Sequence, residues 1–139
     1  MKSLNKIILI TFFAISITGC EYHSDRLKIQ NQSKCPICYV ILIYGKTSKC
    51  FYEATAGGEV KPFSYTSPIV RRGGEISYQL DRTSFDKKLY IIFYDPSYRS
   101  YVMRNIRTIV FDKKYTKVAF NITELDSLGW VIKYNGLCR

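Results

Sequence analysis

Two short apolar runs limit the folds that this chain can adopt. Tyr39–Tyr44 and Leu89–Tyr94 consist of β-branched, aromatic and other apolar residues. Runs of this length and composition are typical of strands that are buried on both faces. Asp95-Pro96 ends the second run, and the polar segment 45–49 predicts a hairpin from the first run into Cys50–Tyr52. We therefore expect a β-sheet whose two faces are both covered.

Other segments alternate between apolar and polar residues, the pattern of strands with one wet face. The predicted strands of this kind cover Leu27 to Gln30, Ile76 to Leu80 and Tyr115 to Phe120, and Trp130 to Tyr134 is predicted to be the closing strand.

The glycines and prolines predict where the chain turns. Ala54 to Glu59 contains Gly57-Gly58 and is predicted to be a loop. Val60 to Tyr65 is predicted to be a short edge strand, because Pro62 has no N–H to donate to a ladder.

Two segments have helical features. The segment from Tyr98 to Arg107 is predicted to be a short amphipathic helix, because Val102, Ile106 and Ile109 have helical spacing, while its β-branched content also permits a strand. Segment 123–129 is predicted to be one helical turn, with Thr123 as its N-cap and Gly129 as its terminator. About seven short strands joined by turns, with one or two helical turns, predict a mainly β fold. The expected architecture is an antiparallel β-sandwich of the immunoglobulin or transthyretin type.

The first twenty residues have the layout of an export signal. Lys2 and Lys6 precede a mostly apolar run from Ile7 to Ile17, and Gly19-Cys20 follows. As a helix this run would reach only about half of a ~30 Å hydrocarbon core, so we expect a cleaved signal helix and no span. Ile17-Thr-Gly-Cys20 resembles the lipobox of bacterial lipoproteins, which implies that Cys20 carries a diacylglycerol and an N-acyl chain such as palmitate. Two or more acyl chains make a stable membrane anchor.

These features predict three regions: a signal peptide over residues 1–19, a lipidated tether over 20–26 and one domain over 27–139. The tether is polar and is expected to be a solvated spacer. Glu21 is not the aspartate of the inner-membrane retention signal, so the resemblance favours the outer membrane, with the domain facing the periplasm or the cell surface.

The charge of the chain predicts anionic partners. Loss of Lys2 and Lys6 with the signal leaves 19 basic residues against 11 acidic ones, a formal net charge of +8. Such a field attracts anions, and an anionic glycan or an envelope protein fits this location. No nucleic-acid partner is expected, because the sequence has no helix-turn-helix or RNP-type pattern. Tyr98, Tyr101, Arg99 and Arg104 are the candidate binding residues, since an aromatic ring beside arginine suits a sugar or an acidic group. A solvated basic surface with half-buried tyrosines is the alternative.

Several segments together resemble a family. The lipobox, the strand 27–33, the segments 67–75 and 89–95, and above all the ending 123–134 are similar to small lipoproteins of Bacteroidota. Their closing phrase is matched by Leu125, Leu128, Trp130, Ile132 and Tyr134, although Asn135 replaces the usual proline. The resemblance implies an envelope lipoprotein with one β-sandwich-like domain, and no activity.

Four cysteines remain besides Cys20: Cys35, Cys38, Cys50 and Cys138. In an exported protein they are disulfide candidates, and three pairings are open. Alternatives are a redox-active Cys35-Pro-Ile-Cys38 pair, a zinc site or free thiols. The redox site is disfavoured because the pair runs into a strand, whereas the dipole of a helix N-terminus is what lowers the pKa of such a thiol.

Catalytic chemistry has few candidates. His23 is the only histidine and lies in the tether, which leaves the domain without a histidine base. The carboxylates Asp81, Asp86, Asp95 and Asp112 show no pattern of a paired acid and base, and Asp81 and Asp95 suit turns. We therefore expect a non-catalytic binding or scaffolding module with no catalytic residue, cofactor or metal. The alternatives are an accessory subunit of an envelope complex, or a thiol-disulfide or carbohydrate-active enzyme.

Overall fold

The structure is a computed structural model that describes residues 22–23, 26–45, 52–70, 75–106 and 115–136. Its elements in chain order are β1 (Tyr22–His23), β2 (Lys28–Asn31), β3 (Ile37–Gly45), β4 (Tyr52–Val60), β5 (Ser64–Thr66), β6 (Ile69–Val70), α2 (Ile76–Arg82), β7 (Ser84–Tyr94), the 3-10 helix η1 (Pro96–Tyr98), α3 (Arg99–Arg104), β8 (Thr116–Phe120), α4 (Ile122–Ser127) and β9 (Val131–Tyr134).

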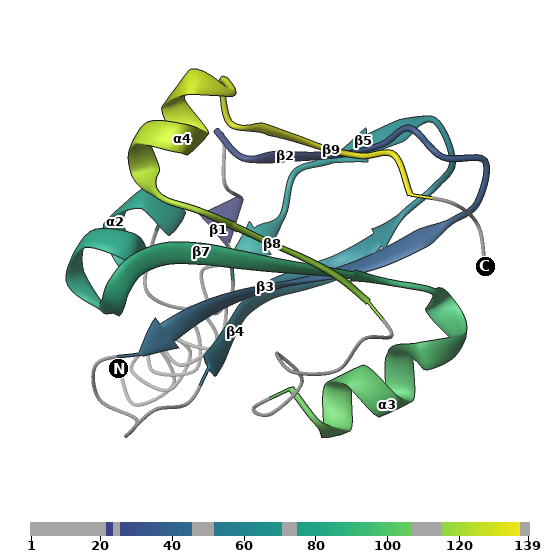
Figure 1. Cartoon of the computed structure of the whole chain (residues 1–139), viewed down its shortest axis with the longest axis horizontal. Helices are drawn as coiled ribbons and strands as arrows, with labels where there is room; N and C mark the ends of the chain where they lie inside the picture. The colour runs from purple at the N-terminus through teal and green to yellow at the C-terminus, as the bar shows by residue number, and fades with distance from the viewer. Residues whose placement is uncertain (1–21, 24–25, 46–51, 71–74, 107–114, 137–139) are drawn as a thin grey trace, which may run out of the picture.

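Two stacked sheets form the body of the domain, and α3 lies on the outer face of the larger one (Figure 1). The larger sheet has the order β4-β3-β7-β8 and is antiparallel throughout. The smaller sheet has the order β5-β2-β9. The predicted mainly β, sandwich-like fold is confirmed, but the smaller sheet is mixed, because β2 and β9 run parallel.

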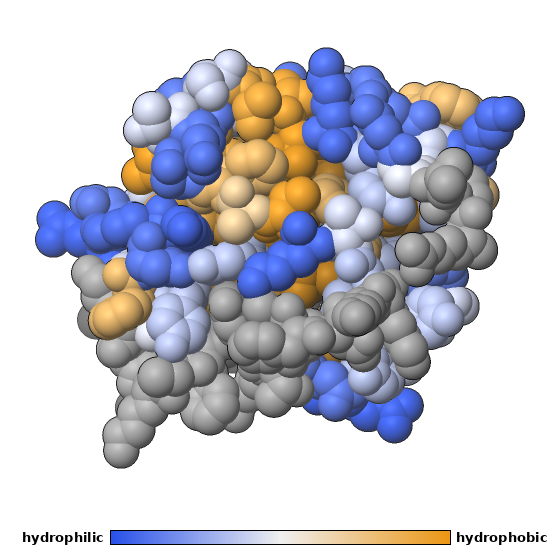
Figure 2. Space-filling view, in the orientation of Figure 1, coloured by the Kyte–Doolittle hydropathy of each residue, from blue (hydrophilic) through white to orange (hydrophobic). Residues whose placement is uncertain are grey.

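The alternating side chains of β3 build two separate cores, as its apolar run predicted. Ile37, Tyr39, Ile41 and Ile43 point into the main core between the two sheets. Cys38, Val40 and Leu42 point the other way into a smaller core, which Val102 of α3 covers. Along the side where α4 approaches β9, apolar side chains reach the surface (Figure 2), and Val118, Phe120 and Ile122 are only partly buried there.

The predicted strand over Ile76 to Leu80 is wrong, because this segment is helix α2. Ile76 and Leu80 are both fully buried, and Tyr78 between them is exposed. Residues four apart share a helix face and residues two apart share a strand face, so this pair fits both patterns. Gln79, which is also buried, belongs to the helical face alone.

The predicted loop over Ala54 to Glu59 is also wrong, because these residues belong to β4. Gly57 and Gly58 pair with Val40 and Tyr39 of β3. A Cβ atom on Gly58 would lie only 3.2 Å from the Tyr39 hydroxyl, so the glycine leaves room for that ring. The predicted edge strand 60–65 is divided: β4 ends at Val60, and β5 begins after Pro62 and Phe63.

The remaining predictions agree with the structure in most details. The predicted short helix is confirmed in part: α3 contains Val102 but ends at Arg104, before Ile106, and Ile109 lies outside the described residues. β8 and β9 are the predicted strands. The connection over 46–51 lies outside the described residues, but β3 and β4 are antiparallel as the predicted hairpin requires. α4 is the predicted helical turn, and Gly129 follows it at φ 60°. Its N-cap is Asn121 and not Thr123.

The tether is not the spacer that its polarity predicted. Tyr22 pairs with Val70, and His23 pairs with Ile69, which makes an antiparallel β1–β6 ladder. The Arg26 guanidinium lies 4.8 Å from the centre of the Trp130 ring and 3.6 Å from a carboxylate oxygen of Asp126. The described part of segment 20–26 is therefore bound to the domain surface.

Candidate functional site

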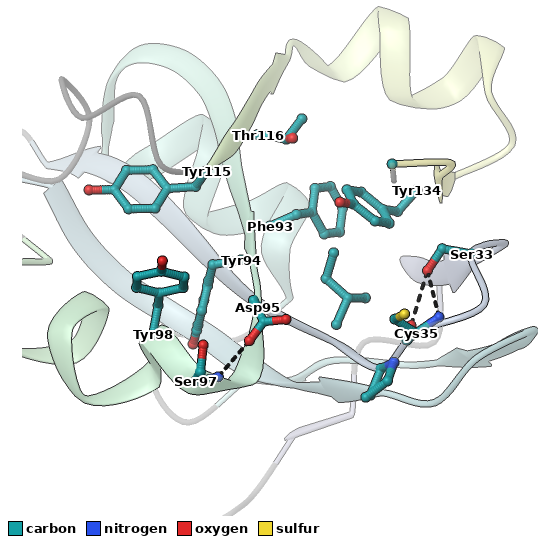
Figure 3. A pocket seen from close by; sticks show the side chains of 13 residues that line it. Ser33, Cys35, Phe93, Tyr94, Asp95, Ser97, Tyr98, Tyr115, Thr116 and Tyr134 are labelled. Carbon is teal, nitrogen blue, oxygen red and sulfur yellow. Dashed lines mark hydrogen bonds between the residues drawn. The ribbon is translucent and has the colours of Figure 1, made fainter. Parts of the chain in front are cut away.

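A cleft of about 380 Å³ opens at one end of the sandwich. Its described lining comes from the β2–β3 connection, the end of β7 with η1, the start of β8 and the end of β9 (Figure 3). Strand pairing brings these distant segments together. Asn31 lies opposite Tyr134, Cys38 opposite Tyr94, and Phe93 opposite Thr116. The cleft is thus a product of register across both sheets.

A buried asparagine shapes the wall that the β2–β3 connection forms. The Asn31 side chain is fully buried and donates to the backbone carbonyl oxygens of Cys35 at 2.7 Å and Val60 at 3.1 Å. Its Oδ1 accepts from the backbone N–H and the hydroxyl of Ser33, at 2.9 and 2.7 Å. These four bonds fix the turn that places Ser33 and Cys35 in the cleft. Asn31 carries no distinct signal in the sequence, because a polar residue after an alternating strand resembles ordinary turn chemistry.

Five of the thirteen described lining residues of the cleft are aromatic. In Figure 3, Tyr98 and Tyr115 lie on one side of the opening, and Tyr134 and Phe93 lie on the other. The rings of Phe93 and Tyr134 pack with their centres 5.0 Å apart. Burial raises the pKa of Tyr94 to about 12, so its hydroxyl keeps its proton at neutral pH. The cleft therefore presents aromatic ring faces together with tyrosine hydroxyl groups.

Asp95 is the one charged residue among the described lining residues, and it lies between the aromatic walls (Figure 3). It follows the last residue of β7 and caps η1, where its Oδ1 accepts from the Ser97 N–H at 2.8 Å. Hydrogen bonds from the Ser97 side chain and backbone lower the pKa of this carboxyl below its ordinary value. Asp95 is therefore a carboxylate at neutral pH and acts as a hydrogen-bond acceptor.

The structure brings only one of the four predicted binding residues into the cleft. Tyr98 lines it. Arg99 begins α3, and its charge opposes the rise in the pKa of Tyr94. Tyr101 and Arg104 lie further along α3, where the Arg104 Nε donates to the Ser100 carbonyl oxygen at 3.3 Å. Arg99 and Arg104 are the first and last residues of the helix.

The two described cysteines have different states. Cys35 lines the cleft and is disulfide-bonded. Cys38 is a free thiol that is 1% exposed, so its prediction as a disulfide cysteine is wrong. Its place on β3 turns it into the smaller core, and this burial raises the pKa of its thiol above the ordinary value. Cys20, Cys50 and Cys138 lie outside the described residues.

The other predicted carboxylates lie apart from the cleft. Asp81 on α2 accepts from the Lys87 Nζ at 3.0 Å, and Asp86 on β7 accepts from the Tyr90 hydroxyl. Asp112 lies outside the described residues. Within the described ranges, no group of three or more histidine, cysteine or acidic side chains is placed to hold a metal ion.

Among the described helices, none is both long and apolar enough to cross a bilayer. Comparisons of the chain with protein-family models, curated proteins and solved structures find no match.

Proposed function

We propose that this chain is a lipid-anchored envelope protein whose domain binds a glycan in the cleft without catalysing a reaction. The observation that supports this most is the chemistry of the cleft, in which tyrosine rings surround one ionised carboxylate. A sugar ring has a face of C–H groups and an edge of hydroxyls. Tyrosine rings cover such a face and supply hydroxyl groups at the same time, and a carboxylate accepts hydrogen bonds from sugar hydroxyls.

The net charge of the chain favours a glycan that carries acidic groups. The formal charge without the signal is +8, and Arg99 follows directly after Tyr98 at the cleft. We propose that sugar hydroxyls meet Asp95 and that acidic groups of the glycan lie toward Arg99. Contacts of this kind steer anionic ligands and weaken as the salt concentration rises.

The state of Asp95 supports binding without catalysis. Glycoside hydrolysis uses two carboxyl groups, one of them an acid whose pKa is raised so that it keeps its proton. The pKa of Asp95 is lowered instead, and it is the sole carboxylate among the described lining residues.

The test compares two tyrosines with the same exposure. Tyr98 and Tyr101 are both 42% exposed, but only Tyr98 lines the cleft. An array of neutral and acidic oligosaccharides is probed with the mature acylated chain in detergent micelles, and the best ligands are titrated. We expect Tyr98→Ala to weaken binding about tenfold and Tyr101→Ala to leave it unchanged. Arg99→Glu is expected to weaken the binding of acidic oligosaccharides and to leave the binding of neutral ones unchanged.

Equal effects of the two tyrosine substitutions would refute the cleft as the binding site. A chain that binds no oligosaccharide, but cross-links to one stoichiometric envelope protein, would favour the accessory-subunit alternative.

The lipid anchor rests on the signal and the lipobox, and it has its own test. Cells that express the full chain are grown with a clickable palmitate analogue. We expect the wild-type chain to be labelled and Cys20→Ser to be unlabelled and to keep its signal peptide. Labelling of the Cys20→Ser chain would place the acyl group elsewhere and overturn the anchor.

A further inference from the structure

We infer that the domain rests on the bilayer at the corner where β1 meets β6, with the cleft at the end that faces away from the lipid. This inference rests on the proposed lipid anchor at Cys20. The main observation behind it is the antiparallel ladder between Tyr22–His23 of β1 and Ile69–Val70 of β6. It fixes the chain to the domain two residues after the expected acylation point.

The ladder shortens the reach of the anchor. A free tether of seven residues could hold the domain up to about 25 Å from the lipidated residue, whereas two residues span only about 7 Å. Val70 is 1% exposed and belongs to the main core, so β6 is a firm attachment. Arg26 gives a second attachment through its contacts with Trp130 and Asp126.

The strand directions place this corner away from the cleft. In the smaller sheet, Ser64 pairs with Asn31 and Thr66 pairs with Ile29, so β5 leads away from the cleft and β6 follows it. Lys28 begins β2 at the same far end, where it lies opposite Val131. Figure 1 shows β1 near α2 and α4, while the end of β7 and α3 lie at the other end of the domain.

The surface chemistry of the corner is compatible with a lipid headgroup region. Ile69, which belongs to the ladder, is 39% exposed. The formal net charge of the chain without the signal is +8. An apolar side chain and a positive domain both favour contact with an anionic bilayer.

The chain carries its own probe of this arrangement. Trp130 is the only tryptophan, and it lies at the end of the domain that contains β1 and Arg26. Energy transfer from Trp130 to dansyl-labelled lipid reports how near this end is to the bilayer. The mature acylated chain is reconstituted into vesicles of phosphatidylethanolamine and phosphatidylglycerol.

Two insertions of eight glycine and serine residues make a matched pair. One lies between Glu21 and Tyr22, before the ladder, and the other lies between Ser24 and Asp25, after it. An insertion of this length adds about 16 Å of flexible reach, and we expect the first to lower energy transfer about twofold or more. The second is expected to leave transfer at the wild-type value, because the ladder still holds β1 on the domain.

An equal loss from both insertions would show that β1 does not hold the anchor on the domain, and it would overturn the inference. No loss from either insertion would show that another surface sets the distance, which overturns it as well. Palmitate labelling of all three chains separates these results from a failure of the proposed function. An unlabelled wild-type chain would refute the anchor itself and the inference with it.

Discussion

Asn31 is the residue whose contacts connect the fold to the cleft. Its fully buried side chain joins the β2–β3 connection to the end of β4 through its bonds to Cys35 and Val60. A buried carbonyl group that loses its hydrogen-bond partner still carries the full free-energy cost of its removal from water. A single side chain therefore supports both the stability of the domain and the shape of one cleft wall.

We expect Asn31→Leu to lower the free energy of unfolding by about 2–4 kcal/mol, since it removes four hydrogen bonds, of which the one to the Val60 carbonyl is buried and the other three are partly buried. Gln32→Leu is the control, because the Gln32 side chain is exposed and should change stability by less than about 0.5 kcal/mol. Urea denaturation of the two variants and the wild type measures both values. Similar stabilities for both variants would contradict this role of Asn31.

The tyrosine content of the chain suggested a recognition surface, but the sequence identified only one tyrosine of the cleft. Tyr98 was found because Arg99 is its neighbour in the sequence. Tyr94, Tyr115 and Tyr134 belong to three strands or their flanks and meet only through strand pairing. The sequence predicts a turn at Asp95, and Asp95 does cap η1. Because the turn already accounts for this residue, nothing in the sequence indicated that it also lines the cleft.

Helix α4 shows how a capping signal in the sequence can be displaced by two residues. Asn121 accepts from the Glu124 N–H at 2.8 Å, and Glu124 accepts from the Asn121 N–H at 2.7 Å, which makes a capping box. Thr123 is also a good capping residue. The helix was therefore predicted to start two residues later than it does.

We expect Asn121→Ala to destabilise the domain by about 1 kcal/mol, because the backbone N–H of Glu124 in the first turn of α4 loses its acceptor. Thr123→Ala tests the alternative cap and should cost less than about 0.5 kcal/mol, since Thr123 is exposed within the helix. Thermal unfolding monitored by circular dichroism distinguishes the two. A larger effect at Thr123 than at Asn121 would show that the capping box does not form in solution.

Strands with continuous apolar runs could be predicted from the sequence. Elements whose apolar residues fit the spacing of both a helix and a strand could not. β3 and β7 contain short continuous apolar runs that are rich in β-branched and aromatic residues, which favours a strand covered on both faces over a buried helix. α2 was predicted as a strand because the spacing of Ile76 and Leu80 fits both a helix face and a strand face. β4 was missed because Gly57 and Gly58 normally break strands, whereas here they make room for Tyr39. Tertiary contacts decided both cases.

At the scale of the molecule, the division into two cores protects Cys38. Its thiol lies between the larger sheet and α3, and burial raises its pKa. A thiol must reach the surface and ionise before it reacts, so its modification requires opening of this core. The structure therefore predicts that Cys38 is unreactive in the folded protein.

We expect iodoacetamide to alkylate Cys38 at least about 100-fold more slowly in the native protein than in the urea-denatured protein. Mass spectrometry of the peptide that contains Cys38 follows this one site, and the denatured sample gives its full labelling rate. Equal rates in the two states would mean that α3 does not close the smaller core.

The parallel pairing of β2 with β9 also determines when this domain can fold. Lys28 pairs with Val131 near the other end of the chain, so the central strand of the smaller sheet stays unpaired on one side until β9 has been added. Contacts between such distant residues form slowly, because a long loop must first close. In the export that we propose, the N-terminus crosses the membrane first, so one edge of β2 has no partner until β9 follows. The smaller sheet is then completed only after nearly all of the described domain has emerged, and the unpaired edge is open to aggregation during transit.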